Sequence, residues 1–147
     1  MTDDFSDLLT ALSDAGVRFL VVGAHALAAH GVPRMTGDLD LWVEPTAQNA
    51  DGIWAALSRF GAPLETLQVQ RSDFVRPDHV IQIGLPPFRV ELMTSISGVE
   101  FTDAWPRRVT GTLFGAPVAF IGRDDFIRNK RASGRPKDLE DIRSLGR

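Results

Sequence analysis

The sequence predicts an α/β (α+β) fold in which a mixed, mostly antiparallel sheet is flanked by helices. Segments with strand-like alternation or short apolar runs are interleaved with segments whose apolar residues recur at the helical period. Some strand-like segments are separated by short turns containing Gly or Pro, which favours hairpins and antiparallel pairing. A chain of 147 residues can bury a sizeable core as one domain. We therefore expect a single domain over residues 1–147, in which 123–147 form a C-terminal helical segment.

Amphipathic periodicity and Gly or Pro boundaries identify the helices. At the N-terminus, Phe5, Leu8, Leu9 and Leu12 recur at i, i+3, i+4 and i+7, so they predict an amphipathic helix. Near the C-terminus, two helical stretches are separated by Gly134-Arg-Pro136, and proline is well suited to a first helical turn. The predicted helices cover residues 3–15, 24–30, 47–60, 124–132 and 137–145.

Strands are predicted where apolar runs or period-two alternation are bounded by turn residues. Val17 to Val22 is an almost continuous apolar run, which is typical of a buried central strand. Two hairpin-like pairs follow, one around Gly84-Leu-Pro-Pro87 and one around Phe114-Gly-Ala-Pro117. The predicted strands cover residues 17–22, 38–43, 80–83, 88–93, 109–113 and 118–121.

Composition excludes several functional classes. A net charge of −3 and a pI near 5.5 argue against indiscriminate binding to nucleic acid or to anionic membranes. The chain has no cysteine, which removes disulfides, thiolate nucleophiles and zinc fingers and fits a reducing compartment. Its apolar runs are far shorter than a membrane span, and its first residues are acidic rather than basic. We expect a cytoplasmic protein that does not contact membranes.

Two aspartates one residue apart are the most informative feature of the chain. Asp38 and Asp40 lie in an alternating strand segment, so their side chains share one face roughly 6.6 Å apart along the strand. Carboxylates that converge in this way repel each other unless a cation lies between them. Their oxygen donors suit Mg²⁺ or Mn²⁺. The alternative is a solvent-facing strand that carries two ordinary charges.

Two further positions fit the same chemistry. Gly23, followed by Ala24, ends an apolar strand and opens a helix, where a glycine lets a triphosphate approach backbone N–H groups. The alternative for this position is plain turn geometry. Glu91 alternates with apolar neighbours on a later strand and is a candidate third carboxylate beside Asp38 and Asp40, or else a solvent-facing charge. Three such acids can hold two metal ions and bind a triphosphate through them.

Polar and basic residues flank these acids. Arg34 is a candidate phosphate partner and Thr36 a capping or hydrogen-bonding residue, although both also suit an ordinary loop. Lys130 belongs to a basic cluster around the Gly134 helix break, which is either a phosphate clamp or a solvated face. Lys137 lies beyond that break and is expected to pair with the nearby acids Asp138 and Asp141.

Taken together, these segments resemble the minimal nucleotidyltransferases of the DNA polymerase β superfamily. The resemblance is closest to small bacterial and archaeal proteins of the type found among AbiEii-like toxins. In that superfamily a hydrophobic strand and a small-residue pair precede Asp-x-Asp and a later strand acid. Here the pattern reads Val22-Gly23-Ala24, Asp38-Leu-Asp40 and Glu91, and similarity extends over Phe19 to Val43, Ile81 to Gly98 and Asn129 to Asp141.

The resemblance implies a fold and a set of residue roles. It implies a polymerase-β-like nucleotidyltransferase fold, with Asp38, Asp40 and Glu91 as metal ligands and catalytic residues. Gly23 would be the phosphate-loop residue, and Lys130 would contact the nucleotide. Two positions depart from the family pattern: Ala24 replaces a Gly or Ser, and Glu91 stands where this subgroup more often has Asp.

The implied activity is Mg²⁺-dependent (or Mn²⁺-dependent) transfer of a nucleoside monophosphate from an NTP to an acceptor. The acceptor is left open between a tRNA end, a protein and a small molecule, and a protein partner is a candidate source of specificity. One alternative is a catalytically weak or inactive binding module, for instance in a toxin–antitoxin pair. Another is a Mg²⁺-dependent nuclease, which the Gly23 turn and the Lys130 cluster disfavour.

Overall fold

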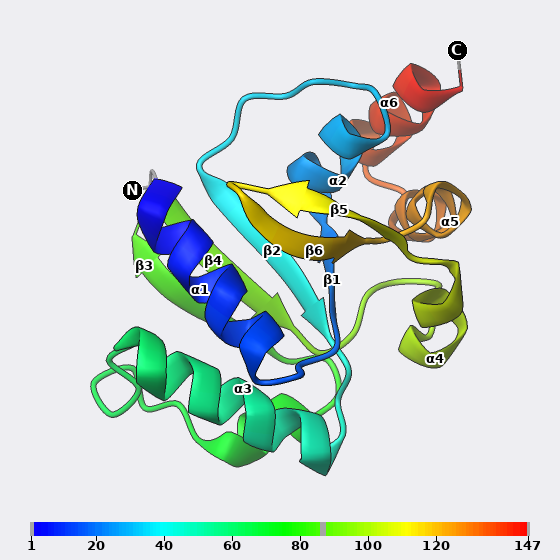
Figure 1. Ribbon diagram of the computed structural model, residues 1–147. Coiled ribbons are helices and arrows are strands. Elements are labelled where there is room, and N and C mark those ends of the chain that lie inside the picture. The colour runs from blue at the N-terminus through cyan, green and yellow to red at the C-terminus, as the bar shows by residue number, and fades with distance from the viewer. Residues whose placement is uncertain (1, 86–87, 147) are drawn as a thin grey trace.

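The computed structural model describes residues 2–85 and 88–146, and within them six strands form one sheet in the order β3-β4-β2-β1-β6-β5 (Figure 1). The central strands are short and apolar, as expected of strands covered on both faces. The strands are β1 (Phe19–Val22), β2 (Asp38–Val43), β3 (Val80–Leu85), β4 (Phe88–Met93), β5 (Val109–Leu113) and β6 (Ala116–Phe120).

The sheet is mixed. Antiparallel pairing joins β1 to β2, β3 to β4 and β5 to β6, whereas β1–β6 and β2–β4 are parallel. The parallel β2–β4 pair matters for function because it brings two segments far apart in sequence into direct register. The predicted α/β class with a mixed, mostly antiparallel sheet is confirmed.

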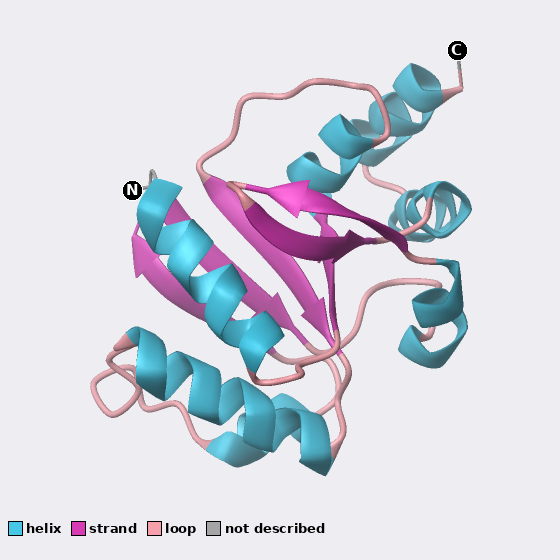
Figure 2. Cartoon of the chain, viewed as in Figure 1, coloured by secondary structure: helices cyan, strands magenta, loops and turns pink. Residues whose placement is uncertain are grey.

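Helices cover both faces of the sheet, as Figure 2 shows. One face packs against α1 and α3, whose apolar residues join those of the strands in one hydrophobic cluster. The opposite face packs against α2, α4 and α5 in a second cluster. None of the helices in the described parts of the chain is long and apolar enough to cross a membrane. The helices are α1 (Thr2–Asp14), α2 (Gly23–Ala29), α3 (Ala47–Phe60), α4 (Phe101–Ala104), α5 (Arg123–Ser133) and α6 (Pro136–Leu145), with short 3₁₀ helices η1 (Arg71–Val75) and η2 (Trp105–Arg107).

Strand β2 shows how alternation divides its residues between the two faces. Leu39, Leu41 and Val43 are fully buried in the cluster with α1 and α3. Trp42 is buried in the other cluster, on the same side of the strand as Asp38 and Asp40. The acidic pair therefore shares its face with α2, α5 and α6, as period-two alternation predicts.

The structure differs from the predicted boundaries in a few places. Strand β6 begins at Ala116, because the hairpin turn is only Phe114-Gly115, and both residues have positive φ (52° and 80°). Such angles are typical of the two-residue hairpin turns that match strand twist. Residues 86–87 of the predicted Gly84–Pro87 turn lie outside the described residues. No prediction covered α4, η1 or η2, because elements of three to five residues are too short to show a period.

Candidate active site

The strand register brings the predicted carboxylates together on one face of the sheet. Asp40 on β2 is directly opposite Glu91 on β4, and on its other side Asp40 is paired with Val22 at the end of β1. Asp38 is opposite Arg89. A parallel pair in this register places all four polar side chains on the same face, because successive side chains alternate. Asp38, Asp40 and Glu91 are each half-buried.

A cleft of about 260 Å³ lies between this face and helix α5. Gly23, Asp40 and Glu91 line its sheet side. Its other wall carries polar and basic residues of α5 and of the break that follows it, namely Asn129, Lys130, Ser133 and Arg135. The cleft thus sets carboxylates against cations across a space that is open to a ligand.

The carboxyl group of Asp40 is the most perturbed acid of this face. Burial raises the pKa of Asp40 to about 6, with further contributions from the negative charges of Glu91 and Asp38. Lys130 and Arg89 act in the opposite direction but do not compensate. An acid whose pKa is raised toward neutral pH by burial and by like charges is typical of a functional site.

Arg89 forms an ion pair with Asp38. Its Nε lies 3.2 Å from Asp38 Oδ1 and its Nη2 lies 3.3 Å from Oδ2, a two-pronged contact, while Nε is 3.8 Å from Glu91 Oε1. Among the described residues, no three His, Asp or Glu side chains are arranged so that they could hold one metal ion. The carboxylates that face the cleft are therefore Asp40 and Glu91, with Asp38 turned toward Arg89.

Gly23 has a geometric reason to be glycine. Its φ is +70°, a conformation that side-chain-bearing residues rarely adopt, and a Cβ at this position would lie 2.2 Å from Asp40 Oδ2. The Asp40 carboxylate therefore rests against the Gly23 backbone at the start of α2. Residue 23 must therefore lack a side chain so that the Asp40 carboxylate can occupy this space, in addition to any requirement of the turn.

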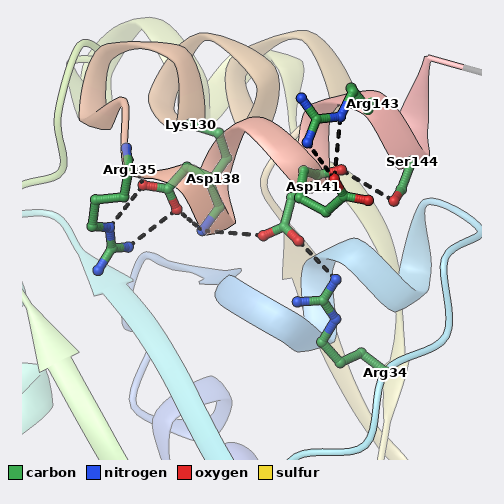
Figure 3. Close-up of polar contacts among 8 residues, drawn as sticks. Arg34, Lys130, Arg135, Asp138, Asp141, Arg143 and Ser144 are labelled. Atoms are coloured by element: carbon green, nitrogen blue, oxygen red, sulfur yellow. Dashed lines mark hydrogen bonds and ion pairs between the residues drawn. The ribbon is translucent and has the colours of Figure 1, made fainter.

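Lys130 is held by carboxylates of α6. Its Nζ lies 3.4 Å from Asp138 Oδ1 and 4.0 Å from Asp141 Oδ2, while Arg135 makes two hydrogen bonds to the Asp138 carboxylate, of 2.8 and 3.1 Å (Figure 3). The Asp138 side chain is fully buried, and the hydrogen bonds from Arg135 hold its pKa well below the usual range. The expected pairing of Lys137 with these acids is wrong, since Lys130, Arg135 and Arg34 take them.

The remaining predicted residues lie outside the lining of the cleft. Arg34 Nη2 is 2.7 Å from Asp141 Oδ1, so it ties the loop before β2 to α6 (Figure 3). The Thr36 hydroxyl accepts a hydrogen bond from the Asp38 N–H at 3.0 Å and so fixes the start of β2. Ala24 is half-buried in the first turn of α2. Any direct contact of these three residues with a nucleotide remains a prediction.

Sequence reasoning missed residues that the fold places in or beside the cleft. Arg89 was recoverable, because it lies two positions before Glu91 in the same strand and must share its face. Asn129 was not: it donates a hydrogen bond to the Ser97 carbonyl oxygen at 3.0 Å, across 32 positions of sequence. Arg135 belongs to the basic cluster around Gly134, and the folded structure shows that it pairs with the carboxylate of Asp138.

Comparison with known proteins identifies the fold. No protein-family model and no curated protein sequence matches the chain. A presumed nucleotidyltransferase from Thermotoga maritima superposes with a TM-score of 0.60 at 18% identity, over 93% of this chain and 86% of that one. An antigenic nucleotidyltransferase-like protein from Paracoccidioides brasiliensis gives a TM-score of 0.54 at 19% identity, over 98% and 74%. The chain therefore has the fold of nucleotidyltransferase-like proteins, and identities this low bear on fold alone.

Proposed function

We propose that this protein is a Mg²⁺-dependent nucleotidyltransferase that moves a nucleoside monophosphate from an NTP to an acceptor and releases pyrophosphate. One observation carries the proposal: the cleft that sets Asp40 and Glu91 against Lys130 and Arg135. The nucleotidyltransferase-like fold supports it. A polyphosphate with bound metal ions requires both kinds of group in such a cleft. The carboxylates ligate the metal ions, and the positively charged side chains bind the phosphates.

The acids fit a hard divalent cation. Mg²⁺ is usually held by one or two carboxylates, with waters and substrate phosphates completing the shell. Asp40 and Glu91 supply two adjacent carboxylates, and burial together with the neighbouring negative charges raises the pKa of Asp40. These two residues would hold the ion, with Asp38 available only if Arg89 leaves it. When bound, such an ion neutralises developing charge on the transferred phosphoryl group.

The other residues would position the nucleotide. Gly23 lines the cleft, and a phosphate would approach its backbone beside the Asp40 carboxylate, which fills the space of the missing side chain. Lys130 would face the phosphates from α5, held in place by Asp138 and Asp141. Glu91 would help to accept the proton of the attacking hydroxyl group. A contact of Arg34 with phosphate would require it to leave Asp141, so we assign that residue a smaller role.

The acceptor is left open between an RNA end, a protein side chain and a small molecule. An assay that does not presuppose it uses each NTP labelled at the α-phosphate, incubated with Mg²⁺ and a cell extract. The wild type should transfer label to one class of molecule, and Asp40→Asn should abolish the transfer, since an amide is a poor ligand for a hard dication. Asp51→Asn is a matched control, because Asp51 is an exposed acid on α3 and does not line the cleft.

A second function is favoured by one specific contact. The two-pronged Arg89–Asp38 pair leaves fewer carboxylates for metal ions than two-ion chemistry requires. A catalytically weak or inactive binding module, for instance one half of a toxin–antitoxin pair, would tolerate this arrangement. NTP binding that is lost in Asp40→Asn, without transfer of label to any acceptor, would favour the module. Shortening of the RNA of the extract, without transfer of label to it, would favour a nuclease instead.

A further inference from the structure

Arg89 is placed like a built-in counter-ion of the acidic face. Its guanidinium reaches both oxygens of Asp38 and also lies 3.8 Å from Glu91, so it spans two of the three carboxylates. The side chains of Arg89, Asp38 and Glu91 are 30%, 39% and 27% exposed, so none of the three is locked in the core.

A divalent cation and Arg89 cannot both use Asp38 as it now lies. Each Asp38 oxygen already accepts a hydrogen bond from the guanidinium, and a cation bound to either oxygen would lie against that positive charge.

We propose that Arg89 competes with a divalent cation for Asp38, so that the free protein offers one ion position, at Asp40 and Glu91. This inference rests on the proposed function, since it concerns the same metal site. A second position opens at Asp38 only when Arg89 leaves. A triphosphate gives Arg89 an alternative bidentate partner, so nucleotide binding and entry of the second ion should be coupled. Arg89 is thereby a residue that sets how many ions the site holds.

The test is a Mn²⁺ titration by calorimetry, without nucleotide, on the wild type and on Arg89→Gln. Loss of a competing partner with the exposure of Arg89 should tighten Mn²⁺ binding about five- to tenfold or add a second Mn²⁺ per chain. Arg89→Lys keeps the charge but lacks the fork, so its affinity should lie between the two. Adding Asp38→Asn to Arg89→Gln should remove the gain, which locates it at Asp38.

Two controls keep the readout specific. Arg59→Gln removes an arginine from an exposed ion pair with Asp14 on the α1–α3 side and should leave Mn²⁺ binding unchanged. Thermal unfolding in EDTA provides a readout independent of activity: Arg89→Gln should be less stable than the wild type, because it leaves Asp38 and Glu91 without the guanidinium that lies close to both. It should then gain more from added Mn²⁺ than the wild type does.

The outcomes separate this inference from the proposed function. If Asp40→Asn loses Mn²⁺ binding but Arg89→Gln binds like the wild type, the competition is absent while the metal site stands. If Arg89→Lys exceeds Arg89→Gln in affinity, charge competition is also excluded. If neither the wild type nor any Arg89 variant binds Mn²⁺, with or without NTP, both the inference and the proposed metal site are overturned.

Discussion

Two groups of acids lie on α6 and on the sheet, on either side of the cations that line the cleft, and they differ in how their charges are compensated. On α6, Asp138 and Asp141 are almost completely buried and meet three cations, Lys130, Arg135 and Arg34. On the sheet, Asp38, Asp40 and Glu91 are more exposed, and the guanidinium of Arg89 lies close to two of them, Asp38 and Glu91. Greater burial would make the α6 acids the more costly ones if they were unpaired. The negative charges of the α6 acids are instead compensated more fully than those of the sheet acids.

The pKa values express this difference. Hydrogen bonds from Arg135 hold the pKa of Asp138 well below its usual range, whereas burial and neighbouring acids raise the pKa of Asp40 to about 6. At neutral pH the ionised carboxylate of Asp138 therefore favours the folded state, whereas that of Asp40 opposes it. An acidic cluster that costs stability is expected where a ligand supplies the missing positive charge. The same substitution in the two groups should consequently have opposite effects.

The largest effect is expected for Asp138→Asn. The change removes the charge that pairs with Lys130, whose side chain is only 12% exposed, and with Arg135. Breaking a buried ion pair by removing one partner should lower the free energy of unfolding by about 3 kcal/mol. Urea denaturation at pH 7.5 measures it. Asp14→Asn, at an exposed pair with Arg59, is the matched control and should cost under about 1 kcal/mol. Equal losses in both variants would contradict the comparison.

Gly23→Ala should come next. Alanine at φ +70° costs roughly 1–2 kcal/mol, and displacement of the Asp40 carboxylate by the new Cβ should bring the total to about 2–3 kcal/mol. Gly134→Ala isolates the backbone term, because Gly134 has the same φ but its nearest neighbour would be at an ordinary 3.7 Å. That control should cost only this backbone term, roughly 1–2 kcal/mol.

Combining Gly23→Ala with Asp40→Ala sharpens this test. The second change removes the carboxylate that the new Cβ would meet, so the cost of Gly23→Ala should fall toward that of Gly134→Ala. Thermal or urea unfolding of the four variants decides the matter. If the cost of Gly23→Ala is independent of residue 40, the contact with Asp40 is not what makes Gly23 necessary.

Asp40→Asn should raise stability, in contrast to Asp138→Asn. The folded-state pKa of about 6 exceeds that of an unfolded Asp, 3.8. Between these values the folded state binds more protons than the unfolded state, so the wild type loses stability as pH rises from 4 to 6. The asparagine variant lacks this loss. At pH 7.5 in EDTA it should be more stable by on the order of 1 kcal/mol, after allowance for solvent screening at a half-buried site.

Measurement at two pH values makes that prediction specific. At pH 4.5 the penalty of ionising Asp40 is only partly developed, so the advantage of Asp40→Asn should be smaller than at pH 7.5. Urea denaturation at both pH values supplies the numbers. An advantage that is equal at both, or a variant less stable than the wild type at pH 7.5, would show that the sheet acids are compensated after all.

The same two regions also differ in how much of their structure could be predicted from the sequence. Alternation within 38–43 was enough to place Asp38 and Asp40 on one face of their strand, and alternation within 88–93 placed Glu91 opposite to Val90 and Leu92, because strand geometry is local. It did not give the register of β2 against β4, which depends on how the whole sheet assembles. The pairings of α6 were misassigned for a related reason. Proximity in sequence favoured Lys137, while the turn at Gly134 folds α6 back so that its buried side meets Lys130 from α5.

The smallest effect is expected for Lys137→Ala, and it tests that reassignment. Lys137 is exposed, and no ion pair of its side chain is present within residues 2–85 and 88–146. A surface substitution of this kind should change the free energy of unfolding by less than about 0.5 kcal/mol and leave NTP binding unaltered.

Lys130→Ala removes a cation of the same type seven positions earlier, where it lines the cleft. It should weaken NTP binding about ten- to a hundredfold, as expected for a lost charged hydrogen bond to phosphate. Fluorescence titrations with one NTP on both variants give the answer. If Lys137→Ala loses affinity for the NTP and Lys130→Ala does not, Lys137 is the phosphate contact. The buried carboxylates of α6, which hold Lys130, then have no role in positioning that contact.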